Sequence, residues 1–346
     1  MTQSQSPSAH TIETIAVTGA TGHVGNVLVR TLNARGITPR AFVRRTSDQG
    51  ALAGAKYDAA HGDVGDLDAL TDAFRGCDTV IHCAAIITIS ERHNPDLRKT
   101  NVEGTRNVLT AAERAGVKRL VYVSSVHALT EPVGAVELNE DAGFDENLAH
   151  GAYGKTKAAA SSLVQKAARE GRLDTVLVLP TGIIGPNDYR LSPQGKMIAM
   201  VGRGMMPLTL AGGYHWVDVR DVCEGALAAH AKGRSGEAYL LDAGRLEALE
   251  LGQAIQEAGG KFAPFAAIPL GWAKPIAKLS PLWERFTHRD AILTPYSLHT
   301  LAARYRVSAA KAQRELGWKG RDPRIAFGDA WRWLRDDPKS PLNRKR

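Results

Sequence analysis

The sequence predicts an α/β protein built on a doubly wound parallel sheet, with a smaller C-terminal lobe that binds the substrate. Three observations predict this class. Short apolar runs alternate with helix-like segments through the first half of the chain. The first run leads directly into a glycine-rich turn and a helix. Beyond Pro180 the alternation loosens and glycine and proline become frequent, which indicates a second unit.

The composition is ordinary for a globular protein, since 44% of the 346 residues are hydrophobic and 23% are charged. No uninterrupted apolar run reaches the ~18 residues that a membrane-spanning helix needs. The three cysteines (Cys77, Cys83 and Cys223) have no metal-ligand spacing, and such sparse use favours a reducing compartment. We therefore expect a cytoplasmic protein without a metal site.

The chain carries a formal net charge of +8. Part of this excess lies in a basic tail at 338–346, and the rest is scattered, without a dense basic run that contains aromatic residues. The pattern predicts a solvated surface that attracts a phosphorylated cofactor, and no nucleic-acid partner. Residues 1–11 are rich in Ser and Gln and lack an apolar signal segment, so we expect a disordered leader.

The first strand, Ile15–Val17, runs into the glycine turn Thr18–Gly25 and then into a helix-like run. Gly19 permits the tight turn, Gly22 lets the backbone approach a pyrophosphate, and Gly25 lets the helix pack closely on the strand. The helix N-terminus offers free N–H groups to the phosphates. This strand–turn–helix context predicts a Rossmann-type dinucleotide site, although the three-and-three glycine spacing differs from the most familiar fingerprint.

The second strand, Arg40–Val43, ends in Arg44 and Arg45. An NAD-binding unit usually places an acid here to bond the ribose hydroxyls, whereas an arginine accommodates a 2′-phosphate. The nearest acid is Asp48, a few residues beyond. The pattern favours NADP(H), with NAD(H) possible and with plain surface charges as the alternative.

The next two strand regions each hold one polar residue of interest. Asp63 follows the third strand, where its carboxylate can reach an adenine amino group or cap the helix that begins near Leu67. His82 lies inside the fourth strand, Thr79–Ala85, where a histidine is more often a satisfied core residue than a catalyst. We therefore treat His82 as core.

A helix is expected from Asn101 to a glycine stop at Gly116, with Asn101 bonding backbone near the site or facing solvent. A fifth strand then ends in Ser124 and Ser125. Residues 127–150 are expected to form a loop over the site.

Tyr153 and Lys157 lie four residues apart in a helix-forming stretch, so their side chains share one face. A phenol with a pKa of about 10 needs help to exchange protons near neutrality. We expect the Lys157 ammonium to lower that pKa. With Ser125, these side chains predict a proton-transfer site beside a nicotinamide ring.

The sixth strand, ending at Pro180, closes an expected dinucleotide-binding domain at 12–180. The lobe should occupy 181–337, with segments at about 215–242 returning to the core. Repeated prolines at 262–286 argue against one long amphipathic helix there and favour irregular packing against the lobe, with a membrane-surface or substrate-lid segment as the alternative.

These motifs, taken in order, resemble those of the extended short-chain dehydrogenase/reductase family over Ile12 to Asp337. Within it, the chain is similar to dihydroflavonol 4-reductase-like and 3β-hydroxysteroid-dehydrogenase-like proteins. The resemblance implies that Ser125, with Ser124 as the alternative, holds the substrate carbonyl and that Tyr153 is the acid/base. It also implies that Lys157 binds the nicotinamide ribose. The motifs are Thr18–Gly25, Gly62-Asp63, His82–Ala85, Asn101–Thr105, Ser124-Ser125, Tyr153/Lys157, Pro180 and Val217–Val219.

Two departures bear on the reaction. The family's 4,6-dehydratases place an Asp-Glu pair after the active-site hydroxyl, whereas this chain has Val126 and His127. Nucleotide-sugar enzymes commonly carry a basic residue before the position of Asp218, and residues 210–216 contain no Arg or Lys. We therefore predict carbonyl reduction or alcohol oxidation of a small apolar substrate by an enzyme that could be a homodimer. The alternatives are an NAD-dependent sugar or nucleotide-sugar epimerase and a non-catalytic NADP-binding sensor.

The predicted cofactor contacts lie at the ends of successive strands. They are Gly19, Thr21, Gly22, His23, Val24, Gly25, Arg44, Asp63, Val64, Ala84, Ala85, Asn101, Tyr153, Lys157, Pro180 and Ile183.

Overall fold

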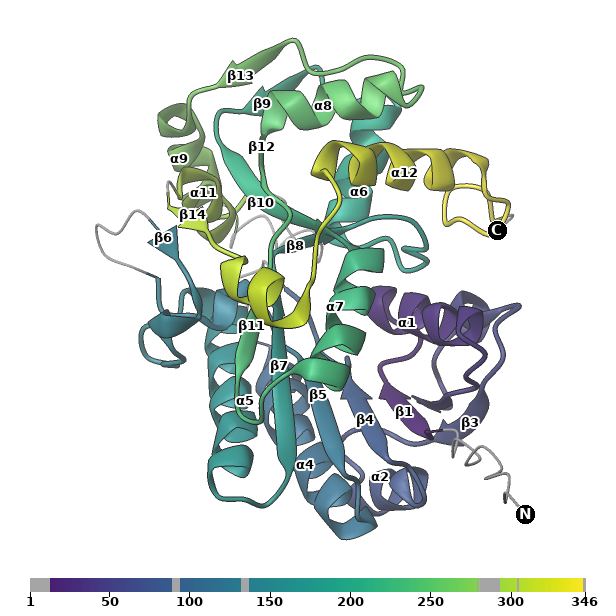
Figure 1. The fold of residues 1–346 in the computed structure, drawn as a ribbon. Helices are drawn as coiled ribbons and strands as arrows, with labels where there is room; N and C mark the ends of the chain where they lie inside the picture. The colour runs from purple at the N-terminus through teal and green to yellow at the C-terminus, as the bar shows by residue number, and fades with distance from the viewer. Residues whose placement is uncertain are drawn as a thin grey trace, which may run out of the picture.

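A seven-stranded parallel sheet forms the centre of the computed structural model (Figure 1). The structure describes residues 13–88, 94–131, 137–278, 280, 293–303 and 305–344, so the expected leader lies outside the described residues. In spatial order the strands are β3 (Asp58–His61), β2 (Arg40–Val43), β1 (Ile15–Thr18), β4 (Thr79–His82), β5 (Arg119–Val123), β7 (Asp174–Pro180) and β11 (Ala238–Leu241). The chain starts at β1 and winds outward in both directions, which confirms the doubly wound class.

Helices cover both faces of this sheet, which explains why the central strands are continuous apolar runs. The helix α1 (His23–Ala34) packs beside α7 (Val219–Lys232) on one face. The other face carries α2 (Leu67–Phe74), α4 (Gly104–Ala115) and α5 (Gly151–Arg169). The crevice for a ligand is expected at the carboxyl ends of the strands, beside the switch between β1 and β4.

Two helix starts differ from expectation. The carboxylate of Asp66 accepts from the Ala69 amide (3.0 Å) and caps α2, while Asp63 accepts from Gly65 two residues on (2.9 Å). The prediction that Asp63 caps this helix is therefore wrong, because a nearer acid takes the position. The helix α4 follows α3 (Pro95–Arg98) and a π-helical turn at Lys99–Glu103 that contains Asn101.

The lobe lies above the carboxyl ends of the strands in Figure 1. Its sheets are β12 (Arg245–Glu247) with β10 (Gly213–Asp218) and β8 (Gly182–Ile184), β13 (Ala266–Ile268) with β9 (Leu208–Leu210), and β14 (Arg306–Val307) with β6 (Glu137–Leu138). Its helices are α6 (Pro193–Gly202), α8 (Ala248–Glu257), α9 (Leu270–Lys278), α11 (Pro295–Ala302) and α12 (Pro323–Asp336).

The proline-rich stretch forms the short β13 and α9, with Pro275 inside the helix, so its described part is not one long helix. Residue 279 and residues 281–286 of this stretch lie outside the described residues. None of the helices that the structure describes combines the length and apolar character needed to cross a membrane.

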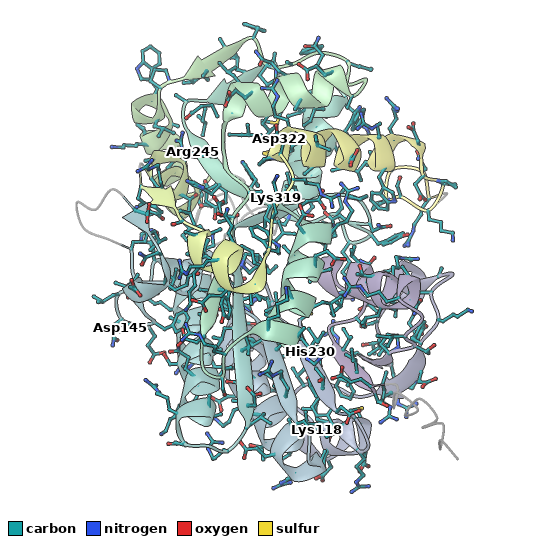
Figure 2. All side chains as sticks on the ribbon, in the orientation of Figure 1. Lys118, Asp145, His230, Arg245, Lys319 and Asp322 are labelled. Atoms are coloured by element: carbon teal, nitrogen blue, oxygen red, sulfur yellow. The ribbon has the colours of Figure 1, made fainter. Side chains whose placement is uncertain are left out.

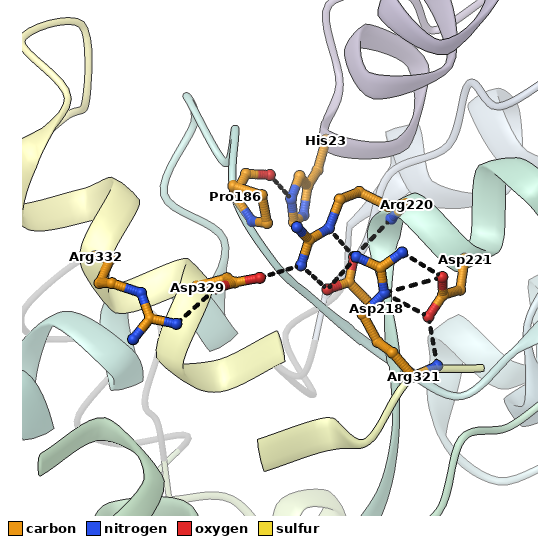
Figure 3. A network of polar contacts seen from close by, with 8 residues as sticks. All are labelled: His23, Pro186, Asp218, Arg220, Asp221, Arg321, Asp329 and Arg332. Atoms are coloured by element: carbon orange, nitrogen blue, oxygen red, sulfur yellow. Dashed lines mark hydrogen bonds and ion pairs between the residues drawn. The ribbon is translucent and has the colours of Figure 1, made fainter. Parts of the chain in front are cut away.

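A network of charges joins the lobe to the sheet (Figure 3). Asp218 at the end of β10 is fully buried and binds Arg220 through both carboxylate oxygens (2.9 and 2.6 Å). Arg220 also donates to the carboxylate of Asp329 in α12 (2.6 Å), and Arg321 donates to the carboxylate of Asp221 in α7. Burial disfavours the charge on Arg220, but its two carboxylate partners raise its pKa above the ordinary value. This network holds α7, α12 and β10 in one arrangement.

Candidate active site

The turn after β1 is shaped for a ligand that approaches the backbone closely. Gly19 has φ +67°, and a Cβ there would lie 2.7 Å from the Ala84 amide nitrogen. A Cβ on Gly25 would collide with the carbonyl oxygen of Gly19. The N-cap residue of α1 is Gly22, which has no side chain to cap the helix N-terminus. This cradle fits the pyrophosphate of a dinucleotide.

The other expected cofactor contacts lie at the same edge of the sheet. Arg44, which is exposed, follows β2, and Asp63 with Val64 follows β3. The strand β4 ends at His82, so Ala84 and Ala85 lie just beyond it. Pro180 ends β7, and Ile183 lies in β8.

Asn101 is buried and connects two parts of this edge. Its side chain donates to the carbonyl of Ile86 (2.9 Å), accepts from the Ile86 amide (2.8 Å) and donates to Thr156 of α5 (3.1 Å). It therefore bonds backbone near the site, and the solvent-facing alternative is wrong. It positions the chain after β4 against α5.

Both ring nitrogens of His82 have hydroxyl partners, Thr18 (2.6 Å) and Thr105 (3.1 Å). Burial lowers the pKa of His82 to about 3, so the ring is neutral. The prediction that His82 is a satisfied core residue is confirmed.

The two serines after β5 have different surroundings. The Ser124 hydroxyl pairs with Ser161 inside the protein (2.6 Å). The Ser125 hydroxyl accepts from the His127 amide (3.2 Å) and acts on the Tyr153 phenol as a hydrogen-bonding group that lowers its pKa. This arrangement favours Ser125 over Ser124 as the substrate-facing hydroxyl.

Tyr153 is buried, with 8% of its surface exposed. Burial raises the pKa of its phenol to about 12, and the hydrogen bond from Ser125 opposes this rise only in part. The expectation of a lowered pKa is therefore not met in the protein alone, because desolvation outweighs the other influences. At neutral pH Tyr153 holds its proton.

Lys157 is 1% exposed, and its ammonium is directed at the end of β5. It donates to the carbonyl of Val123 (2.8 Å) and to the hydroxyl of Tyr122 (3.0 Å), and it lies 4.5 Å from the centre of the Tyr122 ring. Burial lowers the pKa of Lys157 to about 7. Its charge is therefore only partly present at neutral pH, which is a second reason why it does not lower the pKa of Tyr153.

Gly154, between these residues, has a packing role. A Cβ at this position would lie 2.8 Å from the carbonyl oxygen of His127. The absence of a side chain lets the turn after Ser125 lie directly on α5, which brings the Ser125 hydroxyl to the phenol of Tyr153.

An aromatic cluster that sequence reasoning missed lies beside the phenol, with His127 at its centre. The His127 ring meets Tyr153 edge-on at 6.3 Å, stacks on Tyr214 at 6.0 Å and lies 5.6 Å from Tyr296. The Tyr214 hydroxyl and the His127 ring share a hydrogen bond (2.7 Å). Burial lowers the pKa of His127 to about 4, so this wall is uncharged at pH 7. Its members come from distant segments, and no local spacing links them.

A histidine–aspartate pair that sequence reasoning also missed lies beside this cluster. Nδ1 of His215 on β10 bonds a carboxylate oxygen of Asp242, just after β11 (2.9 Å). Among the described residues, Nε2 of His215 is buried and has no hydrogen-bond partner. His215 lines a cavity with His127, Tyr214 and Thr181, where a polar group of a ligand could satisfy it.

The model of the NAD dependent epimerase/dehydratase family matches residues 15–241. Sterol demethylase protein B of Methylococcus capsulatus is 36% identical over 93% of this chain and 98% of its own. A putative dihydroflavonol 4-reductase of Synechocystis is 32% identical over 92% and 94%. A 3 beta-hydroxysteroid dehydrogenase/Delta 5-->4-isomerase of Mycobacterium tuberculosis is 29% identical over 88% and 85%. The expected branch is thereby confirmed.

Among solved structures, the crystal structure of gox2253 superposes with a TM-score of 0.81 at 33% identity. The match covers 95% of this chain and 99% of that one. The sheet and the lobe therefore recur together in this structure.

Proposed function

Since the chain belongs to the NAD-dependent epimerase/dehydratase family of extended short-chain dehydrogenases/reductases, we propose that it is an NADP(H)-dependent oxidoreductase. It reduces a ketone or aldehyde of a small apolar substrate, or oxidises the corresponding alcohol. The observation that carries this proposal is the buried, protonated phenol of Tyr153, held by Ser125 at the carboxyl end of β5.

The side chains divide the work of the reaction. The bound nicotinamide would supply or accept a hydride. Ser125 and Tyr153 hydrogen-bond the substrate oxygen, and Tyr153 delivers its proton to that oxygen as the carbonyl becomes an alcohol. Lys157, one helical turn from Tyr153, would hold the nicotinamide ribose. Positioned acid catalysis of this kind contributes about 10²–10⁴ in rate.

The substrate class follows from the wall around Tyr153. His127, Tyr214 and Tyr296 present rings rather than cations, which suits a flat apolar molecule better than a sugar diphosphate. The names of the relatives refer to sterols, steroids and dihydroflavonols. We therefore propose a polycyclic ketone or alcohol, with His215 available for a second polar group on it.

The test is a screen of 3-ketosteroids, dihydroflavonols and aromatic aldehydes with NADPH consumption as readout. We expect at least one class to be reduced and the purified protein to release its nucleotide freely. If no carbonyl compound were reduced, and the protein kept NAD⁺ while interconverting nucleotide sugars, the epimerase alternative would replace this proposal.

A further inference from the structure

The loop between β8 and α6 crosses the glycine turn, although the two are more than 160 residues apart in the chain. The His23 ring donates to the carbonyl of Pro186 (3.0 Å; Figure 3), and Asn26 donates to the carbonyl of Asn187 (3.1 Å). Arg190 then donates to the Thr21 hydroxyl (2.6 Å). The lobe thus places a guanidinium directly on the expected cofactor cradle.

The backbone on either side of Arg190 is strained. Asn187 has φ +68° and Leu191 has φ +52°, and no other described residue except glycine has a positive φ. Such conformations persist where surrounding contacts enforce them, often at ligand sites. Here the buried carboxylate of Asp188 accepts from the amide and the hydroxyl of Ser192 (2.8 and 2.6 Å) and fixes the loop. The strain is therefore maintained by contacts that hold Arg190 over the turn.

Cations from three parts of the chain converge around Arg190. Arg44, which follows β2, and Asp48 both act electrostatically on Arg190. Burial lowers the pKa of Arg190, Arg44 lowers it further, and Asp48 acts in the opposite sense. Asp48 is itself paired with Arg344 near the C-terminus (2.8 Å), whose guanidinium lies 5.7 Å from the centre of the Tyr189 ring.

These charges do not balance among themselves. Asp48 pairs with Arg344, and among the described residues neither Arg44 nor Arg190 forms an ion pair with a carboxylate, so their two positive charges are left for a ligand. Guanidinium groups bind phosphate oxygens in a two-pronged geometry, which makes an arginine pair suited to a doubly charged phosphomonoester.

We propose that Arg190, reaching over from the lobe, forms with Arg44 a two-arginine site for the 2′-phosphate of NADP(H). Thr21 positions Arg190, and the Asp48–Arg344 ion pair holds the loop after β2 in place. The inference rests on the proposed function, because that function supplies the ligand, NADP(H). It adds Arg190 and the Asp48–Arg344 contact to the arginine that follows β2. Through Arg190, cofactor selection depends on the substrate lobe as well as on the nucleotide domain.

The experiment is calorimetric titration of the full chain with NADPH, NADH, 2′,5′-ADP and 5′-AMP, so no turnover is needed. For Arg190→Gln we expect NADPH and 2′,5′-ADP to bind about tenfold more weakly, with NADH and 5′-AMP changed less than twofold. Arg190→Lys should lose less, because it keeps the charge. Lys118→Ala, which removes an exposed charge at the amino end of β5 (Figure 2), should leave the affinity for all four ligands unchanged.

The outcomes separate this inference from the cofactor assignment. If wild type preferred NADH, the proposed NADP(H) dependence itself would fail. If wild type preferred NADPH but Arg190→Gln weakened NADPH and NADH equally, Arg190 would serve the shared pyrophosphate. That result, or no change for either ligand, would overturn the 2′-phosphate assignment alone.

Discussion

At the proposed reaction end of the site, around Ser125, Tyr153 and Lys157, the polar groups are buried and come from the end of β5 and from α5. At the proposed adenosine end, around Arg44, Arg190 and Arg344, the arginines come from three distant parts of the chain. Tyr153 and Lys157 are 8% or less exposed, whereas Arg44 and Arg344 are exposed. Arg190 is exposed as a whole residue, although its guanidinium is covered enough for burial to lower its pKa. The first region contains phenols and neutral rings, and the second contains an excess of positive charge.

The difference shows how two kinds of recognition use the same fold. Burial sets the protonation state at the reaction end, raising the pKa of Tyr153 and lowering that of Lys157. At the adenosine end the arginines stay charged at all ordinary pH values. Ligand affinity there should therefore depend mainly on the electrostatic attraction of an anion. The first end should therefore respond to pH and to removal of hydroxyls, and the second to salt and to removal of charges.

Removing the phenol should have the largest effect and should be confined to the reaction end. Tyr153→Phe deletes only the hydroxyl, so carbonyl reduction should fall about 10³-fold while NADPH binding stays within twofold. Stopped-flow reduction and calorimetry measure the two quantities. Tyr57→Phe is the matched control, because it removes a partly buried phenolic hydroxyl bonded to Gln49 outside the site. Wild-type turnover in Tyr153→Phe would refute the catalytic assignment.

Substitutions in the charge network between sheet and lobe should lower the stability of the protein more than substitutions at exposed ion pairs. Asp218→Asn removes a fully buried charge and leaves Arg220 with a weaker partner, so the free energy of unfolding should fall by about 3 kcal/mol. Urea denaturation measures this change. Asp72→Asn, at an exposed pair, should change it by less than ~0.5 kcal/mol. Equal losses in the two variants would mean that the network contributes little.

The pH dependence should distinguish the two directions of the reaction. With a pKa of about 12, Tyr153 is protonated throughout pH 6–9, so the proton donor is always present and the rate of reduction at saturating NADPH should be nearly independent of pH. Oxidation needs the phenolate, whose population rises as pH approaches the pKa, so kcat/KM for the alcohol should increase up to about tenfold per pH unit. A rate of oxidation that fell as pH rose would contradict this assignment.

Salt should affect the adenosine end more than the reaction end. Raising ionic strength from 20 to 500 mM should weaken NADPH binding severalfold more than NADH binding, because only NADPH carries the 2′-phosphate. Fluorescence titration of both cofactors across this range measures the difference. Parallel losses for the two cofactors would show that the arginines do not read the 2′-phosphate.

At the reaction end, the features that depend on residues close together in the sequence could be predicted. The spacing of Tyr153 and Lys157 on one helix, the glycine turn and the serine at the end of β5 are all readable within short windows. Buried parallel strands were likewise evident as apolar runs between helices. The raised pKa of Tyr153 is not readable in this way, because it comes from burial of the phenol. The His127 ring meets the Tyr153 ring, and Tyr214 and Tyr296 of the lobe lie against His127.

The adenosine end was only partly predictable. Arg44 follows from its place after β2, but Arg190 meets Thr21 across 169 residues and Arg344 meets Asp48 across 296. The sequence around Arg190 or Arg344 gives no sign of these long-range contacts. The tail, expected to be merely a basic extension at 338–346, is fixed by the buried Ser340, whose hydroxyl donates to the carbonyl of Leu334 (2.7 Å). Residues 345–346 lie outside the described part.

The central claim is that Tyr153 completes a net hydride transfer to a carbonyl, and isotope transfer tests it most directly. The protein is incubated with a reducible polycyclic ketone and NADPH carrying deuterium at both C4 positions of the nicotinamide, and the product is analysed by mass spectrometry. We predict one deuterium on the new alcohol carbon, with one NADP⁺ released per product. Inversion of a substrate centre without net cofactor oxidation would contradict it.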